Sequence, residues 1–114
     1  MAVDKSLQTG STAMLLLQLL EEEDMYGYQM IETLTARSNN VFSLKAGTLY
    51  PLLHQMEKSG LVTSYEKSAG LSRVRKYYSI TPKGTKQLQQ KRQEWETFSC
   101  AVNLVLGRGR YATW

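Results

Sequence analysis

The side chains of this chain best suited to chemistry are cations, and they gather in its second half. From Lys67 to Gln93 the sequence contains eight lysine and arginine residues and no acid, whereas from Met1 to Glu32 it contains six acids and a single cation. Arg73, Arg75 and Lys76 form a basic ladder within this stretch. Cations that neutralise phosphates release condensed counterions, so such a run favours binding to a polyanion such as a nucleic acid. The net charge of +4 alone says little about a partner, but its segregation predicts one face for a phosphate-rich molecule.

A β-hairpin is expected to position these cations. Segments 61–65 and 76–80 are rich in β-branched and aromatic residues, and segment 68–72, Ser-Ala-Gly-Leu-Ser, is typical of a flexible turn between two strands. The basic ladder belongs to the second strand. Of the adjacent pair Tyr77 and Tyr78, one ring is expected to point inward and to pack against the protein.

A short helix is expected just before the hairpin, beginning near Thr48 or shortly before it. Its apolar stripe has the spacing i, i+3, i+4 and i+7 and comprises Leu49, Leu52, Leu53 and Met56. The outward face comprises Thr48, Tyr50, Pro51, His54, Gln55 and Lys58. Pro51 must lie in the first turn, where its missing N–H costs nothing, and Gly60 is placed to end the helix. Small proteins use a helix followed by a basic hairpin to present one element to a DNA groove and another to the backbone beside it.

Two more helices are expected before this one. Apolar residues at helical spacings predict the first from near Ser6 or Ser11 to about Leu20. The second begins in segment 26–28 and stops at segment 38–40, Ser-Asn-Asn. The pattern is helix, tight turn, helix.

The last helix opens with Thr81 as N-cap and Pro82 in the first helical position, and it ends at Gly107. Its apolar residues alternate between the a and d positions of a heptad, with Lys91 as the one polar interruption. These seam residues are Leu88, Trp95, Phe98, Val102 and Val105. Such a seam seeks a partner helix, and 114 residues leave room for only a modest core. We therefore expect a homodimer.

Other classes of function find little support in the sequence. His54 is the only histidine, and the single cysteine, Cys100, excludes an intramolecular disulfide, while its apolar neighbours predict a small buried hydrophobe. The acidic run 21–24 is expected to be a solvated turn, because consecutive carboxylates seldom converge on a metal. Segment 14–20 is too short to span a bilayer. We expect no enzyme, no cofactor, no metal site, no membrane association and a cytoplasmic location.

Four strings of residues, in order and at matching spacing, resemble the PadR family of bacterial transcriptional regulators. They are Tyr26–Ile31, Gly47–Leu53, Met56–Val62 and Arg75–Thr81, and the resemblance extends from about residue 7 to residue 105. Any one string is weak evidence, but four in order make a chance match improbable. The single C-terminal helix resembles the short subfamily, in which that helix dimerises.

The resemblance implies an α+β, mostly helical fold. It implies a winged helix-turn-helix DNA-binding domain over residues 1–81, a dimerisation helix packed on it over residues 82–107, and a tail over residues 108–114. Members of the family are usually repressors, often released by a small molecule. The expected partners are double-stranded DNA in the nucleoid, a second copy of the chain, and a small-molecule effector. The symmetry of a dimer implies a palindromic operator with half-sites about one helical turn apart.

The resemblance also assigns residues to DNA binding. The third helix would lie in the major groove, and the hairpin, as the wing, would contact phosphates. The DNA-binding residues implied are Lys45, Thr48, Tyr50, Pro51, His54, Arg73, Arg75 and Lys76. Tyr50 and His54 also fit a simpler interpretation as exposed helix residues. Four further cations stay ambiguous between DNA contact and ordinary solvation: Lys83, Lys86, Lys91 and Arg92.

The tryptophan of the last helix raises a second question. In some short PadR-like proteins a tryptophan of this helix stacks on flat ligands in a pore between subunits, and Trp95 and Phe98 match that region, with Met14 and Leu15 as expected neighbours. The alternative is a plain aromatic anchor of the dimer core. A rival function is a winged-helix protein-interaction module that does not bind DNA, but such a module should lack a concentrated basic wing.

Overall fold

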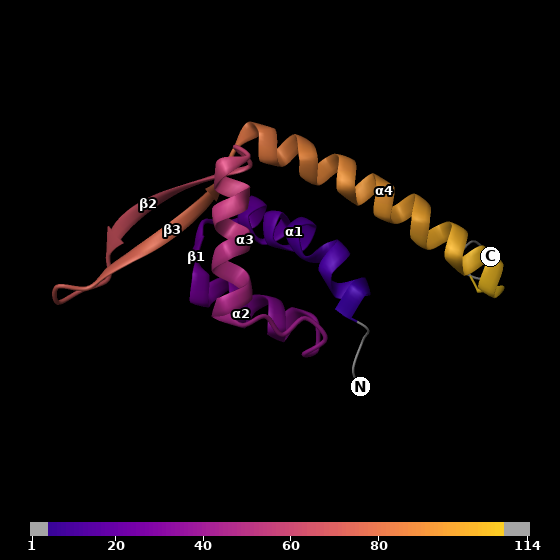
Figure 1. The fold of residues 1–114 in the computed structure, drawn as a ribbon, viewed down its shortest axis with the longest axis horizontal. Coiled ribbons are helices and arrows are strands. Elements are labelled where there is room, and N and C mark those ends of the chain that lie inside the picture. The colour runs from indigo at the N-terminus through magenta and orange to yellow at the C-terminus, as the bar shows by residue number, and fades with distance from the viewer. Residues whose placement is uncertain (1–4, 109–114) are drawn as a thin grey trace.

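The computed structural model describes residues 5–108, and in it three helices and a small sheet pack together while a long fourth helix projects away from them (Figure 1). The predicted α+β, mostly helical class is confirmed. The elements in chain order are α1 (Lys5–Glu22), β1 (Met25–Tyr26), α2 (Gly27–Arg37), α3 (Ala46–Lys58), β2 (Val62–Ser68), β3 (Val74–Ile80) and α4 (Pro82–Leu106).

One hydrophobic core joins every one of these elements. Helix α1 lies at its centre, in contact with α2, β3 and α4. The predicted stripe of α3 faces this core, with Leu49 and Leu53 fully buried and Leu52 half-buried. The largest fully buried side chains are Leu16, Leu17, Leu20, Met30, Leu49, Leu53, Leu88 and Val62.

Most helix ends follow the sequence signals, but the prediction that Pro51 lies in the first turn of α3 is wrong. The helix begins at Ala46, with Lys45 as its N-cap, so a full turn precedes Pro51 and the proline lies inside the helix. The Thr81 hydroxyl accepts a hydrogen bond from the Gly84 N–H at 3.0 Å, with Pro82 in the first turn of α4. Gly60 and Gly107 have φ values of 80° and 78°, the left-handed region in which glycine ends a helix without strain. These predicted caps are confirmed. The tail assigned to residues 108–114 lies, beyond residue 108, outside the described residues.

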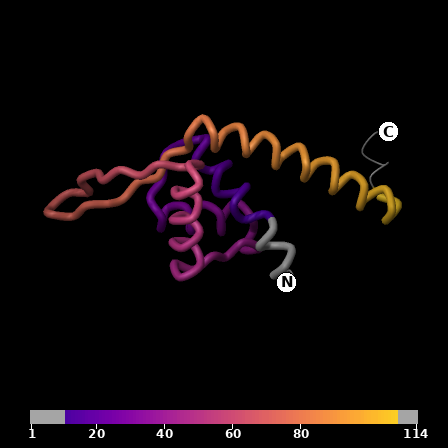
Figure 2. The backbone as a smooth tube through the Cα atoms, turned by 45° about the horizontal axis from the view of Figure 1, so that its top comes forward, coloured from indigo at the N-terminus to yellow at the C-terminus, as the bar shows by residue number. Residues whose placement is uncertain are grey.

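The sheet is antiparallel, with strand order β1-β3-β2. The predicted hairpin is confirmed, but its strands are longer than expected, since β2 continues to Ser68 and β3 begins at Val74. The extra residues make a ribbon that protrudes from the helices (Figures 1 and 2). The sequence analysis missed β1, whose two residues pair with Tyr77 and Tyr78. Tyr78 is the inward ring of the adjacent pair, as predicted, and is buried.

All four residues of the acidic run 21–24 are exposed, as predicted, but they do not form a plain turn. Glu22 still belongs to α1, and its carboxylate pairs with Arg37 of α2 at 2.9 Å. Glu21 pairs with Arg92 of α4 at 3.3 Å, and Asp24 accepts a hydrogen bond from the Tyr65 hydroxyl at 2.7 Å. Glu23 also accepts a hydrogen bond from the Gln29 side chain of α2, at 3.4 Å, so all four acids tie α1 and the segment after it to α2, α4 and β2.

Residues 5–108 contain neither a candidate metal site nor a candidate membrane span. No group of three or more histidine, cysteine, aspartate or glutamate side chains gathers where it could hold a metal ion. No helix in this part of the chain is both long and apolar enough to cross a membrane.

Helix α4 divides into two parts. Its first turns pack on the body of the protein, where Leu88 is fully buried. Leu88 therefore belongs to the chain's own core, and its assignment to an intermolecular seam is wrong. Beyond Arg92, which still pairs with Glu21 of α1, the helix leaves the other elements (Figure 2), so its apolar residues are exposed. Cys100, expected to be buried, is exposed for the same reason.

Candidate nucleic-acid interface

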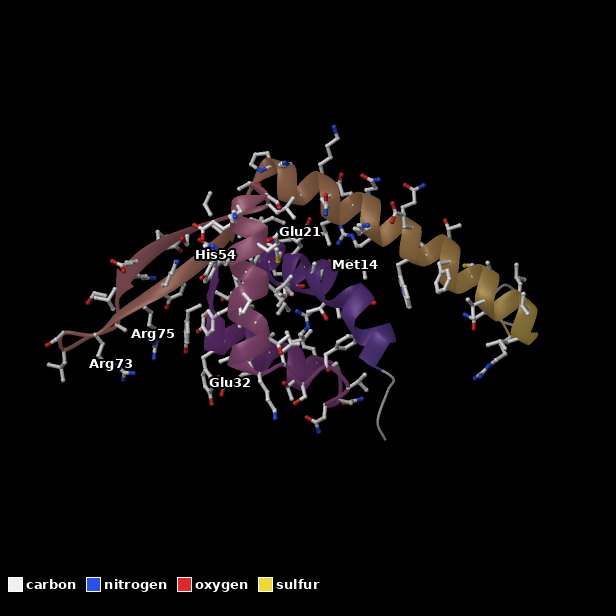
Figure 3. All side chains as sticks on the ribbon, in the orientation of Figure 1. Met14, Glu21, Glu32, His54, Arg73 and Arg75 are labelled. Carbon is white, nitrogen blue, oxygen red and sulfur yellow. The ribbon has the colours of Figure 1, made fainter. Side chains whose placement is uncertain are left out.

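The outward face of α3 is free of packing contacts with the core. Thr48, Pro51 and His54 are exposed, as is Lys45, which precedes the helix in an extended conformation as its N-cap residue. These side chains alternate with the buried leucines because the helix turns once every 3.6 residues. Figure 3 shows His54 on this helix, beside the base of the hairpin. The helix thus presents a polar row to solvent.

Tyr50 has a second role that the sequence analysis missed. Its ring lies against the backbone of Gly27, at the start of α2, so closely that a Cβ atom on Gly27 would overlap the Tyr50 hydroxyl. Tyr50 nevertheless stays 45% exposed. The residue therefore joins α3 to the first turn of α2 while keeping much of its surface available to a partner. A side chain at position 27 would force the Tyr50 ring to move away from α2.

The C-terminal end of α3 is fastened on two sides. The Lys83 ammonium of α4 donates to the Ser59 carbonyl at 2.7 Å, and the Thr81 hydroxyl donates to the Gly60 carbonyl at 2.6 Å. A cation beside the last carbonyls of a helix also interacts favourably with the helix dipole. On the hairpin side, the Ser64 hydroxyl donates to the Glu57 carboxylate at 2.7 Å. Helix α3 is therefore held at a defined angle to both the hairpin and α4.

The three predicted wing cations do not form a single row. Side chains of a strand alternate between its two faces. Arg73 and Arg75 therefore share one side of the hairpin, as Figure 3 shows. Lys76 lies on the other side with the buried Tyr78, its Nζ atom 5.6 Å from the centre of the Tyr78 ring. A polyanion that followed one side of the hairpin would therefore meet either Arg73 and Arg75 or Lys76, but not all three.

A row of tyrosines crosses the arginine side of the sheet. The Tyr77 ring meets Tyr26 edge-on at 5.5 Å and stacks on Tyr65 at 5.8 Å between ring centres. The Arg75 guanidinium carbon lies 4.3 Å from the centre of the Tyr26 ring, and the Lys67 Nζ atom lies 5.3 Å from that of Tyr77. Both distances are within the range of cation–π attraction. Tyr26 and Lys67 were not predicted, and only strand alternation across three paired strands brings them together.

The charges of this region are available to a ligand. Within residues 5–108, Arg73, Arg75 and Lys76 form no ion pair; the cations that do are Arg37, Lys91 and Arg92. Two of the four cations left ambiguous by the sequence are thus engaged with acids, and a third, Lys83, with the end of α3. The hydrogen bond that Tyr65 donates to the Asp24 carboxylate raises the pKa of that phenol, because deprotonation would place two anions side by side. The Tyr65 phenol therefore adds no negative charge beside these cations.

The residues expected around an effector do not share a cavity within one chain. Trp95 and Phe98 are neighbours on α4, with ring centres 6.1 Å apart, and Phe98 lines an open groove of about 570 Å³ along that helix. Leu15 instead lines a cavity of about 170 Å³ between α1, α2 and the segment after it. Met14 is half-buried on α1. A common pocket for these four residues needs a second chain.

Comparison with known proteins agrees with this arrangement. Residues 16–90 match the model of the transcriptional regulator PadR-like family. A transcriptional regulator from Clostridium thermocellum is 33% identical and superposes with a TM-score of 0.81 over 89% of this chain and 95% of that one. A PadR-like transcriptional regulator from Bacillus cereus is 33% identical, with a TM-score of 0.79 over 89% of this chain and 96% of that one. Transcriptional regulator Rv3488 from Mycobacterium tuberculosis is 27% identical over 86% of this chain and 88% of its own length. The fold is thus that of known transcriptional regulators, and the chain belongs to the PadR-like family.

Proposed function

We propose that the chain is a homodimeric repressor of transcription that binds a palindromic DNA site. Helix α3 enters the major groove, and the β2–β3 hairpin, the wing, contacts the backbone beside it. Two-fold symmetry then requires two inverted half-sites about one helical turn apart. Membership of the family supports DNA binding and regulation. The repressor role, the dimer and the palindrome go beyond what membership gives.

The observation that carries DNA binding is the polar face of α3 beside unpaired cations of the wing. Thr48 and His54 point away from the core and can reach base edges, whereas Arg73 and Arg75 supply phosphate contacts. Arginine suits phosphate because its planar fork of donors matches two oxygens at once. The base contacts supply specificity, and the phosphate contacts supply most of the affinity and its salt dependence.

The outer part of α4 supports the dimer. After the buried Leu88, the helix carries a seam of exposed apolar side chains, comprising Trp95, Phe98, Val102 and Val105. An exposed apolar face of this length marks an interaction site. Its heptad spacing suits another helix, and a second copy of α4 offers an identical seam for an isologous contact.

An effector site between the two copies follows from the same residues. Two copies of the Trp95–Phe98 pair brought together would provide flat, apolar walls, with Met14 and Leu15 of α1 nearby. A planar apolar molecule bound there would change the orientation of the two copies relative to each other, and the dimer would then release the DNA. Quenching of tryptophan fluorescence by planar aromatic dyes, lost in Trp95→Leu, tests this part of the proposal.

The first test is selection from a random duplex library with the purified protein, followed by titration of the enriched site at several salt concentrations. We expect an inverted repeat and a steep salt dependence. Arg73→Ala and Arg75→Ala should each weaken binding to all sequences and reduce the slope of log K against log salt by about 0.9. Arg37→Ala removes a cation of α2 that already pairs with Glu22; it is the control and should leave the slope unchanged.

The same experiment separates this proposal from its rival. No enriched sequence and no binding at low salt would refute DNA recognition and favour a protein-interaction module. Enrichment of a site without inverted symmetry would contradict the dimer on a palindrome but not DNA recognition. Reporter expression from a promoter that carries the enriched site distinguishes a repressor from an activator.

A further inference from the structure

Tyr26 lies where three elements meet. It is the second residue of β1 and the residue directly before α2, where it occupies the N-cap position without a side-chain capping bond. Its ring faces Tyr77 of β3 edge-on and carries the Arg75 guanidinium carbon 4.3 Å from its centre. The Tyr26 side chain thus packs on the wing, although its backbone belongs to the start of α2.

We infer that Tyr26 is a positioning residue for DNA binding, because its ring holds the Arg75 guanidinium at the base of the wing. This inference rests on the proposed function. Arg75 is half-buried, whereas Arg73 nearer the turn is exposed and has no aromatic ring against it among the described residues. Of the two arginines on this side of the hairpin, Arg75 is therefore held against an aromatic ring, whereas Arg73, just before β3, is not.

The contact with the Tyr26 ring favours binding because it restricts the Arg75 side chain before the DNA is bound. An arginine loses rotamer freedom when it binds a phosphate, and a side chain that is already restrained loses less. A cation–π contact uses the face of the ring and no hydrogen-bond acceptor, so the guanidinium N–H groups stay free to donate to phosphate oxygens. The aromatic contact thus restrains the cation without occupying its donors.

Tyr26 also ties the wing to the helix that reads the groove. The next residue, Gly27, receives the ring of Tyr50 from α3. Tyr26 therefore contacts the wing through its side chain, and Gly27, which has no side chain, contacts α3 through its backbone. The wing and α3 are the two elements proposed to face the DNA. These contacts add to the hydrogen bond between Ser64 and Glu57 in fixing the wing relative to α3, and this placement determines which phosphate Arg75 can reach when α3 lies in the groove.

The test compares Tyr26→Leu with Tyr26→Phe on the selected DNA site, with Tyr65→Phe as the control. Leucine removes the aromatic face, phenylalanine keeps it, and the control removes only the bond to Asp24. We expect Tyr26→Leu to weaken binding about threefold to tenfold and to lower the salt slope by up to about 0.9. Tyr26→Phe should bind like the wild type. In an Arg75→Ala background, Tyr26→Leu should cause no further loss, because the residue acts through Arg75.

A second readout needs no DNA. The side-chain protons of Arg75 should show an upfield ring-current shift by NMR that disappears in Tyr26→Leu and persists in Tyr26→Phe. A loss of affinity by Tyr26→Leu that persists undiminished in the Arg75→Ala background would overturn the inference, since it would indicate a general loosening of the fold. Equal binding by wild type and Tyr26→Leu would overturn it as well. Failure of the wild type itself to bind any duplex would instead refute the proposed function, and the inference with it.

Discussion

Leu88 and Trp95 lie seven residues apart on one helix, in equivalent positions of a heptad, yet Leu88 is fully buried and Trp95 is 50% exposed. The first packs into the core of its own chain, against which α1 and the sheet also pack. The second lies where α4 has left that core, as do Phe98 at 58% exposure and Val105 at 87%. The same sequence pattern thus serves two different environments.

One part of the molecule forms a complete core within a single chain, whereas the other part keeps an apolar surface exposed. The winged part, from α1 to the first turns of α4, buries its apolar residues and fastens α3 on three sides. The outer part of α4 has no other element of the described chain against its apolar side. Specific substitutions should therefore affect folding in the first region and association in the second.

The largest effect is expected in the core of the winged part. Leu53→Ala removes a fully buried side chain beneath the exposed side of α3, and it should lower the free energy of unfolding by about 2–5 kcal/mol. Gln55→Ala, exposed on the same helix, should change it by less than about 0.5 kcal/mol. Urea denaturation at one fixed protein concentration measures both, because a dimer's stability depends on concentration. Equal effects would contradict the burial described for α3.

A smaller loss is expected where α4 first meets the core. A Cβ atom on Gly84 would overlap the Leu61 carbonyl and the Ile80 side chain, so Gly84→Ala should lower the free energy of unfolding by about 1–3 kcal/mol. Gly47, in the first turn of α3, has open space around it. Gly47→Ala should therefore stabilise the protein by up to about 1 kcal/mol. Thermal melts that ranked the two in the opposite order would refute this packing.

The outer part of α4 should respond in association and not in folding. Trp95→Glu places a carboxylate in the seam, and it should raise the dimer dissociation constant about tenfold or more while the monomer stays folded. Gln89→Glu adds the same charge one residue after the buried Leu88, off the seam, and should leave dimerisation unchanged. Sedimentation velocity over a range of concentrations gives both constants. A Trp95→Glu protein that dimerises like the wild type would show that this face is not the interface.

The smallest effect concerns a surface pair of the winged part. Hydrogen bonds from the Arg37 guanidinium, and then from Gln18, lower the pKa of the Glu22 carboxyl. A lowered folded-state pKa contributes stability above the unfolded pKa and loses it as the pH falls through the folded pKa. The wild type should therefore lose more of its Tm than Glu22→Gln on acidification from about pH 6 to about pH 2. Parallel Tm curves for the two proteins would mean that the pair contributes nothing, as many exposed pairs do.

Much of the fold was predictable because its signals are local. The caps Thr81 and Gly60 and the apolar stripe of α3 depend on residues a few positions apart, and all lie where expected. The strand β1 was missed because two residues have no periodicity, and only their pairing with β3 defines them. A heptad pattern likewise says that Leu88 is buried but not in which molecule.

The candidate site was predictable in composition more than in geometry. The exposed residues of α3 and the cations of the hairpin were named from the sequence, and alternation along β3 was already sufficient to place Arg75 and Lys76 on opposite faces. The contact between Tyr26 and Arg75 was not foreseeable, because it joins residues from two strands whose pairing the sequence does not reveal. Contacts of this kind, between residues far apart in the sequence, can be identified only once the fold is known.

The most direct test of the account is the mass of the complex on the selected duplex, measured by sedimentation equilibrium. The account predicts two chains on one duplex with inverted half-sites, and one chain on a duplex that carries a single half-site when Trp95→Glu is used. One wild-type chain on the full site would contradict the division of the molecule into a DNA-binding part and an outer helix completed by a second copy.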